Sequence, residues 1–335
     1  MSQEKHRRIV VSSRGGPGVL EVVEEDLPKP GTGEVRVRVL TAGVSAFDLM
    51  VRSRSFPGFP RLPFTPGCDI VGVVDELGEG VSTVERGQTV AGGPFFSGGY
   101  AEFTCLPADE LVLVPPGVDP ADAVCLVANY LTAHLEMHQV ARVRSGERIL
   151  VQGAAGGVGT ALLELGKLAG LEMYGTASKP NHQLVSTLGA TPIDYRAEDF
   201  VERIRSLTGD GVDVVFDPIG GGRQLWRSYQ ALRKGGRLVW FGVAAISKAG
   251  IKVIPLSLMT RFLVTLIPDG KHAPSTPNAG KLSQTQTLAE LLDHLAAGKI
   301  QPVVAARIPL VEAARAHELL ERGGYAGKVV LVAGA

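Results

Sequence analysis

Residues 148–159 read Arg-Ile-Leu-Val-Gln-Gly-Ala-Ala-Gly-Gly-Val-Gly, and this stretch decides the fold. Residues 148–152 are expected to form a strand and 160–169 a helix. A glycine-rich loop between them is typical of dinucleotide-binding folds, because small residues let the backbone approach a pyrophosphate and the helix start offers free N–H groups. Ala154 stands where the G-x-G-x-x-G pattern has its first glycine, so the prediction depends on the strand–loop–helix context. A turn that serves only close packing is the alternative.

The segments after this loop alternate between the strand pattern and the helix pattern of apolar residues. Strands are expected over 172–176, 192–194, 212–216 and 237–241, and helices over 179–188, 199–207 and 223–232. Repeated alternation of this kind indicates a parallel sheet covered by helices on both faces.

The segments before the loop are rich in short strands. Residues 35–39 alternate between valine and arginine, 9–11 and 19–23 flank a Gly/Pro turn, and 70–74 is apolar. This pattern indicates a small barrel-like domain, followed by a helical stretch over 121–140. Near the C-terminus an exposed loop is expected over 271–285. Helices over 288–296 and 311–322 and strands over 303–308 and 328–332 are expected to complete the chain.

Length and charge narrow the class of protein. A chain of 335 residues is expected to form about two domains. Lys plus Arg equals Asp plus Glu, at 34 each, so nothing favours nucleic acid or an anionic membrane as a partner. The apolar run 251–267 is interrupted by Pro255 and Arg261 and is too short to span a bilayer, so it is expected in the core or at a subunit interface. Three unpaired cysteines and no apolar signal segment favour a cytoplasmic protein.

The cofactor can be inferred from the residues that follow the second strand. NAD-binding loops usually have an Asp or Glu about 20 residues onward that binds the ribose hydroxyls. Residues 174–179 contain no acid but offer hydroxyl groups and Lys179, which suit a 2′-phosphate. The sequence therefore favours NADP(H), with Lys179 as an ordinary surface lysine as the alternative.

With this loop placed after a β-rich domain, the chain resembles the medium-chain dehydrogenase/reductase superfamily over nearly its whole length. The segments that carry the resemblance are 28–35, 66–69, 72–74, 78–81, 98–102 and 327–331. The form of the loop at 154–159 resembles that of the zinc-free quinone oxidoreductase branch. Residues 129–133, 175–178, 192–195 and 217–221 resemble its vesicle-amine-transport-protein-like subgroup.

The resemblance implies an α/β architecture with a Rossmann doubly wound parallel sheet and a GroES-like catalytic domain. The Rossmann domain would span 127–269, inserted between 1–126 and 270–335 of the catalytic domain, with the nicotinamide in the cleft between them. It also implies a homodimer joined through the strand 237–241 or the apolar segment after it. The cofactor-binding residues that the resemblance implies are Thr132, Ala155, Gly156, Gly157, Val158, Gly159, Thr176, Ser178, Lys179, Tyr195, Phe241, Gly242 and Val243. The subgroup's lysine aligns with Asn181, so either Lys179 replaces it or NADPH binds more weakly.

Neither zinc site of the superfamily is expected in this chain. The zinc members have a cysteine shortly before the position of Asp48 and a His-Glu pair after that of Gly67, where this chain has Ser45-Ala46 and Cys68-Asp69. A catalytic zinc needs three protein ligands, and three cysteines cannot supply a four-cysteine structural site. Cys68 is therefore expected to be a small buried residue. His134 and His138, spaced i, i+4, lack a third ligand and are expected to be polar residues on one side of a helix.

A metal-free site suits acceptors that spread the new negative charge. We therefore expect NADPH-dependent reduction of a small-molecule quinone or α,β-unsaturated carbonyl compound, with Ser45, Met50, Phe56 and Tyr130 as pocket candidates by position in the family. Ser45 stands where several enzymes of the branch have a longer asparagine, which leaves enones open beside quinones. Tyr130 is equally well explained as a core aromatic. Two alternatives remain open: a zinc-type alcohol dehydrogenase in name only, and an NADPH-binding scaffold with little turnover.

Overall fold

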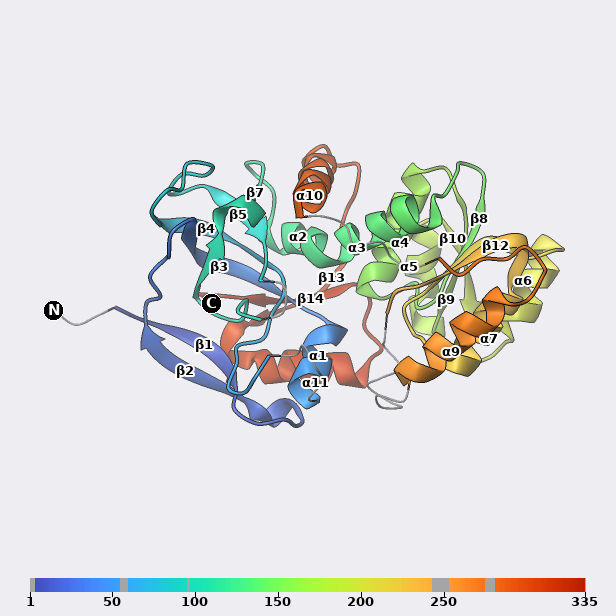
Figure 1. The fold of residues 1–335 in the computed structure, drawn as a ribbon, viewed down its shortest axis with the longest axis horizontal. Helices are drawn as coiled ribbons and strands as arrows, with labels where there is room; N and C mark the ends of the chain where they lie inside the picture. Colours follow the sequence, from blue (N-terminus) through green and yellow to red (C-terminus); the bar gives the residue numbers. More distant parts are fainter. Residues whose placement is uncertain (1–3, 55–59, 95–96, 243–252, 275–280, 335) are drawn as a thin grey trace. The chain divides into compact units, whose positions relative to one another are not determined.

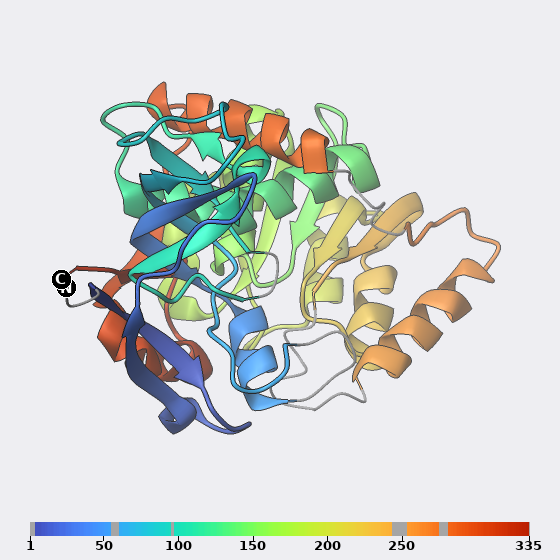
Figure 2. The same ribbon diagram turned by 60° about the vertical axis from the view of Figure 1, so that its left-hand side comes forward.

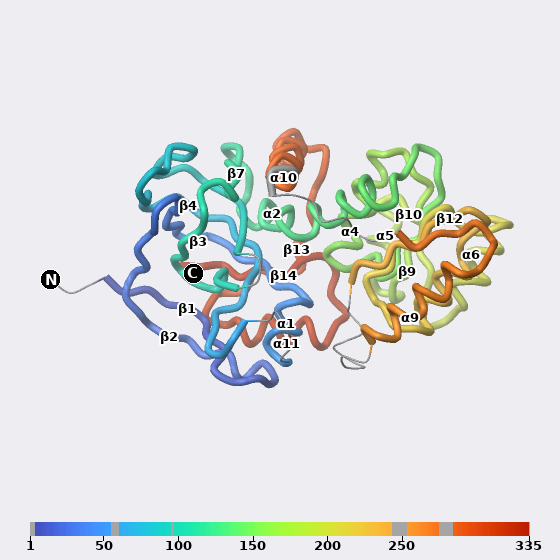
Figure 3. Tube along the Cα trace, viewed as in Figure 1, coloured from blue at the N-terminus to red at the C-terminus, as the bar shows by residue number. Residues whose placement is uncertain are grey.

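The computed structural model describes residues 4–54, 60–94, 97–242, 253–274 and 281–334, and the chain forms two compact units. Unit 1 contains Met1–Leu131 and Ala279–Ala335, and unit 2 contains Thr132–Asn278. The sequence expectation puts the divisions at 126/127 and 269/270. Figure 3 shows unit 1 assembled from the blue-to-green and the red parts of the chain, on either side of unit 2 in sequence.

Unit 2 is built on a five-stranded parallel sheet in the order β10-β9-β8-β11-β12 (Figure 1). The chain begins with β8 in the middle, adds β9 and β10 on one side and then crosses to β11 and β12, which is the doubly wound order. The strands are β8 (Arg148–Val151), β9 (Glu172–Ala177), β10 (Ala190–Asp194), β11 (Val212–Asp217) and β12 (Leu232–Trp240). The helices are α3 (Leu131–His134), α4 (Gly157–Leu168), α5 (His182–Thr187), α6 (Phe200–Thr208), α7 (Gly222–Gln230) and α9 (Val253–Thr265).

Helices cover both faces of this sheet because successive strand residues point to opposite sides. Leu150 and Tyr174 share a core cluster with residues of α6, α7 and α9. On the other face, Gly166 of α4 lies so close to Ile149 and Met173 that a Cβ there would contact both side chains. The expected parallel sheet covered on both faces is confirmed.

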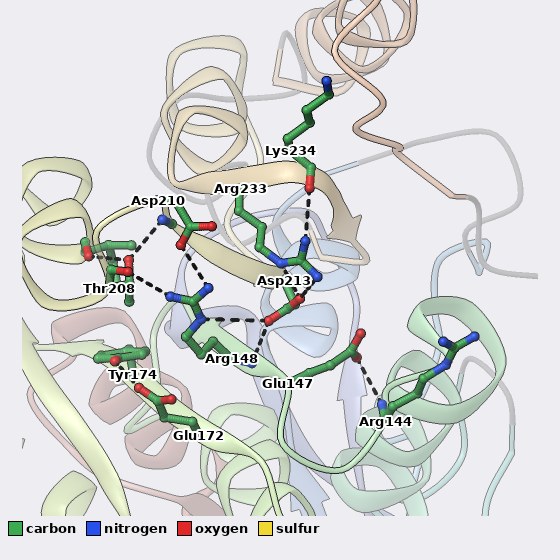
Figure 4. Close-up of polar contacts among 12 residues, drawn as sticks. Arg144, Glu147, Arg148, Glu172, Tyr174, Thr208, Asp210, Asp213, Arg233 and Lys234 are labelled. Carbon is green, nitrogen blue, oxygen red and sulfur yellow. Dashed lines mark hydrogen bonds and ion pairs between the residues drawn. The ribbon is translucent and has the colours of Figure 1, made fainter.

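The amino ends of these strands are joined by ion pairs and hydrogen bonds (Figure 4). Arg148 at the start of β8 binds Asp210 at 2.8 Å, and its backbone N–H donates to Asp213 of β11 at 2.8 Å. Arg233 of β12 donates to the same Asp213 at 2.5 Å. This edge is therefore occupied by mutual contacts, and the opposite edge is where the glycine loop lies.

Unit 1 contains a seven-stranded sheet and a separate hairpin (Figure 2). The sheet has the order β13-β14-β3-β4-β5-β7, with β6 paired to β3, and β1 pairs with β2 across the predicted turn. The strands are β1 (Lys5–Val11), β2 (Leu20–Asp26), β3 (Glu34–Val44), β4 (Ile70–Leu77), β5 (Thr89–Gly92), β6 (Phe103–Pro107), β7 (Val112–Leu113), β13 (Val304–Pro309) and β14 (Lys328–Val332). The helices are α1 (Ala46–Ser53), α2 (Pro120–Cys125), α10 (Lys281–Ala296) and α11 (Ala313–Arg322). Val35, Val37 and Val39 are buried, which confirms the alternation expected of β3.

Two expected elements differ from those observed. The helical stretch expected over 121–140 contains two π-helical turns, Leu126–Tyr130 and Leu135–Ala141. The loop expected over 271–285 is wrong at its end, because α10 begins at Lys281. The polar composition of 271–285 suggested a loop, but burial of Thr287, Leu288, Leu291 and Leu292 at helical spacing holds the helix on unit 1.

Of the apolar run 251–267, residues 253–265 form α9, which is only partly buried. Val253, Ser257, Thr260 and Val264 are buried, and α9 packs against α7. We call the remaining apolar side chains the α9 apolar face. It consists of Leu256, Leu258, Met259, Phe262, Leu263 and Leu266, each between 46% and 63% exposed. In the part of the chain that the structure describes, no helix has the length and apolar character needed to cross a bilayer.

Candidate functional site

The glycine loop joins the end of β8 to the first turn of α4. Gly153 has a φ of +64°, a conformation that suits glycine, and Gly156 is the N-cap of α4. A Cβ on Gly159 would lie 2.3 Å from the carbonyl oxygen of Gly153, so only glycine lets the helix start this close to the loop. The N–H groups of Gly157, Val158 and Gly159 belong to the first turn and have no acceptor within the helix. The loop therefore presents free donors where a helix dipole favours an anion.

A buried hydrogen-bond network fixes this loop to the ends of β9 and β11. The Thr176 hydroxyl donates to the Gln152 side-chain oxygen at 2.8 Å and accepts from the Gly153 N–H at 3.0 Å. The Gln152 amide donates to Ser228 at 3.4 Å, and the Ser228 hydroxyl donates to Asp217 at 2.7 Å. Thr176, which was expected among the cofactor-binding residues, thus has its hydroxyl engaged in holding the loop.

Asp217 closes this network at the end of β11. Its carboxylate also accepts from the N–H groups of Ile219 and Gly220, at 2.8 and 3.0 Å. Burial raises the pKa of Asp217, and the hydrogen bonds oppose that effect. Gln152 and Asp217 were not predicted from sequence as site residues, although each directly follows or ends an apolar strand, which was the available signal.

The carboxyl ends of β9 and β10 bring two pairs of residues to one edge of the sheet. Asp194 pairs with Ala177, so Ser178-Lys179 and Tyr195-Arg196 follow neighbouring strand ends. Tyr195 is 51% exposed, and the Arg196 guanidinium lies 5.6 Å from its ring centre. Lys179 is exposed and Ser178 is buried. Arg196 was not predicted; its position directly after Tyr195 was the signal that could have found it.

The end of β12 reaches the same edge. The Phe241 N–H donates to the Asp217 carbonyl at 3.3 Å. A Cβ on Gly242 would lie 2.2 Å from the Pro218 carbonyl oxygen, so glycine is required where the chain passes the end of β11. Val243 lies outside the described residues, and Thr132 is half-buried in α3.

Two of the four acceptor-pocket candidates, Ser45 and Met50, belong to α1 or its N-cap in unit 1. Ser45 is the N-cap of α1 and is half-buried, as is Met50, whereas Phe56 lies outside the described residues. Tyr130 is 1% exposed within the first π-helical turn, which fits the alternative of a core aromatic.

Ser45 is hydrogen-bonded to Asp48, whose carboxyl group is wholly buried. The Ser45 hydroxyl lies 2.6 Å from Asp48 Oδ2, and the Ser45 N–H donates to the same oxygen at 2.8 Å. Asp48 Oδ1 accepts from the Gly67 N–H at 3.1 Å and from the Cys68 thiol at 3.8 Å. Burial raises the pKa of Asp48 against the effect of these bonds.

Cys68 is largely buried and lies near two carboxyl groups. Burial, together with Asp48 and Asp69, raises the pKa of the Cys68 thiol far above its ordinary value. Within the described ranges no three His, Cys, Asp or Glu side chains are grouped so that they could hold a metal ion. The His134 and His138 rings lie 4.5 Å apart between centres.

Comparisons with known proteins agree with this geometry. Residues 31–116 match the alcohol dehydrogenase GroES-like domain and residues 188–331 match a family described as zinc-binding dehydrogenase. A rat quinone oxidoreductase is 31% identical, covering 98% of each chain. A rat synaptic vesicle membrane protein VAT-1 homolog is 32% identical over 92% of this chain and 78% of its own. The structure of Escherichia coli quinone oxidoreductase complexed with NADPH matches with a TM-score of 0.86 and 28% identity, over 97% of this chain and 99% of that one.

Proposed function

This chain belongs to the medium-chain dehydrogenase/reductase superfamily, and from that premise we propose that it transfers a hydride from NADPH to a quinone or an α,β-unsaturated carbonyl compound. The observation that carries the proposal is the anchored glycine loop, with Gly159 packed against Gly153 and the free N–H groups of α4 beside it. NADPH, when bound, supplies the hydride.

The described residues fit such a dinucleotide. Ala155 to Gly159 would bind the pyrophosphate through backbone N–H groups, as helix starts bind anions. Phe241 and Gly242 follow the end of β12 at the same edge of the sheet, so they are our candidates for contacting the rest of the cofactor. The bound cofactor of the Escherichia coli quinone oxidoreductase supports this proposal.

Preference for NADPH over NADH would come from Lys179 and Arg196. Both follow the carboxyl ends of adjacent strands, and neither forms an ion pair with an acid within the described residues. The lysine of the subgroup aligns with Asn181, so that position offers no cation here. Arg196 would supply a second cation beside Lys179. Ser178 and Tyr195 would complete this 2′-phosphate subsite with hydroxyl groups.

The acceptor would lie near the half-buried Ser45 and Met50. No step through zinc is proposed, because Cys68 has no set of partner ligands in the described residues. A quinone or enone takes a hydride without a metal when the site supplies orientation and hydrogen-bond donors for the developing negative oxygen.

The α9 apolar face supports a homodimer formed through unit 2. Six large apolar side chains on one helix and its end exceed what isolated surface positions explain. A second copy of the chain that covers this face would remove them from water.

The proposed function is tested by following oxidation of NADPH and of NADH after chelator treatment. The acceptors are 1,4-benzoquinone, 9,10-phenanthrenequinone, an alkenal and a plain ketone. We expect turnover of the conjugated acceptors with NADPH, unchanged by the chelator. If only the ketone were turned over, and the chelator abolished that activity, the proposal of a metal-independent reaction would be contradicted. NADPH binding without turnover of any acceptor would favour the scaffold, a possibility raised by the vesicle-protein relative.

A further inference from the structure

We propose that Asp48 is the proton donor of the reduction, acting through the hydroxyl group of Ser45. The inference rests on the proposed function, since it requires an acceptor at Ser45. It assigns a chemical role to a carboxyl group that the sequence analysis used only to locate the zinc-ligand position of the family.

Asp48 differs from Asp69, the neighbouring buried carboxyl group, in having no ion-pair partner within the described residues. Both Asp48 and Asp69 are 0% exposed. Asp69 forms an ion pair with the buried Lys328 at 2.7 Å, whereas Asp48 forms no ion pair with any cation in the described ranges. A buried carboxylate without a cation is costly, so the neutral acid is favoured.

The hydrogen bonds around Ser45 let it pass a proton outward. The Ser45 hydroxyl donates to Asp48 Oδ2 across 2.6 Å when Asp48 is ionised, and across the same contact it accepts when Asp48 carries a proton on Oδ2. Ser45 Oγ also accepts from the Asp48 N–H at 3.3 Å. Its own hydroxyl hydrogen is then free to point toward a bound acceptor.

The step balances in atoms and charge. An acceptor that has taken a hydride from NADPH is reduced by two electrons and carries an anionic oxygen. That oxygen takes the Ser45 proton as the Asp48 proton moves to Ser45 Oγ, so one O–H bond forms on the acceptor and one breaks on Asp48. After the product leaves, water reprotonates Asp48 through Ser45, which is half-exposed.

Three side chains from distant parts of unit 1 prepare Asp48 to carry the resulting charge. The Arg52 guanidinium lies 3.0 Å from His317 Nδ1, so Nδ1 must accept and the ring hydrogen is on Nε2. Nε2 then donates to the Tyr100 hydroxyl across 3.3 Å, which leaves the Tyr100 O–H directed at Asp48. All three side chains are at most 1% exposed.

Gly67 fixes the position of Tyr100 in this chain of bonds. Its φ is +98°, and a Cβ there would lie 2.5 Å from the Tyr100 ring. The ring therefore packs on the backbone of Gly67 while the Gly67 N–H donates to Asp48.

The charged or titratable groups that face Asp48 are Tyr100, Cys68, Asp69 and Lys328.

The first test is infrared titration of the full-length protein without cofactor. We expect the carbonyl stretch of protonated carboxyl groups at neutral pH in the wild type, reduced in Asp48→Asn and unchanged in Asp109→Asn, which alters an exposed carboxyl group of the same unit. The buried Asp217 is present in both variants, so the difference between them reports Asp48. An unchanged band intensity in Asp48→Asn would overturn the proposal.

The second test is the pH profile of kcat with an enone. Because the acid form donates, the wild-type rate should fall as pH rises through the Asp48 pKa. Asp48→Asn should lose about 10²-fold in kcat and lose that limb, with the dissociation constant for NADPH unchanged. Tyr100→Phe removes a donor to the carboxylate, so its limb should move to higher pH.

Ser45→Ala keeps the test decisive if Asp48→Asn does not fold. It should lose a similar factor in kcat while keeping the infrared band. Wild-type kcat and an unchanged pH profile in Asp48→Asn or Ser45→Ala would overturn the role of Asp48 and leave the proposed function intact. A wild type that reduces no acceptor would instead contradict the proposed function, and this inference with it.

Discussion

At the scale of residues, the preference for one cofactor depends on two cations. Replacing Lys179 or Arg196 by Ala should each raise the dissociation constant for NADPH about tenfold, because a charge-assisted contact to phosphate contributes about 1.5–3 kcal/mol. NADH affinity should stay the same. Fluorescence titration of both cofactors measures this, with Lys167→Ala, an exposed lysine of α4, as the control. Equal losses for NADPH and NADH would show that neither side chain contacts the 2′-phosphate.

Short segments of sequence point to the local part of the candidate site but not to its long-range contacts. The glycine loop and Ser178-Lys179 could be read from short segments, because backbone conformation and strand ends position them. Arg196 directly follows Tyr195 in sequence, but its position over the Tyr195 ring depends on a side-chain rotamer, which the sequence does not give. The contacts among Asp48, Tyr100 and His317 could not be read from the sequence either, because residues far apart in sequence meet only after folding.

At the scale of elements, α11 contacts α1 through His317. Protonation of this histidine would lower the stability of the folded protein. Burial and the nearby Arg52 lower the pKa of His317 to about 3. The unfolded chain therefore binds the proton more readily, so stability is lost as pH falls from about 6.5 toward about 3. His317→Gln should show a shallower loss in this window, by up to about 1.4 kcal/mol per pH unit.

Urea unfolding at several pH values measures this difference. His294→Gln, in a half-buried position on α10, is the control and should follow the wild-type slope. Parallel slopes for wild type and His317→Gln would mean that this histidine is not held neutral by the fold.

Element types were predicted well where one periodicity continues and less well where tertiary packing decides. The strands and helices of unit 2 follow the expected order, because alternating strands and helices leave few arrangements. The π-helical turns of 126–141 and the early start of α10 depend on packing that composition does not encode.

At the scale of the whole molecule, the α9 apolar face predicts a dimer. Phe262 is 63% exposed, and Phe262→Glu would place a charge at the centre of the interface. We expect sedimentation velocity to show a dimer for the wild type and a monomer for this variant. Leu113→Glu, at an exposed leucine of unit 1, should remain dimeric. A monomeric wild type would contradict the predicted interface.

The overall architecture was predictable from sequence because the glycine loop, the strand order and the family resemblance point to the same fold. The expected boundaries of 126/127 and 269/270 compare with divisions at 131/132 and 278/279, and helical continuity through 126–141 leaves no break in sequence at the first of these.

The pairing of β14 with β3 has a consequence for how the protein is made. Val44 lies opposite Val329, so the central strand of the unit 1 sheet must wait for a partner that leaves the ribosome after all of unit 2. Unit 2 is continuous in sequence and can fold while the chain is still being synthesised. During that interval residues 41–44 of β3 offer unpaired N–H and C=O groups on one edge, which makes them a segment open to wrong pairing until the C-terminus is synthesised.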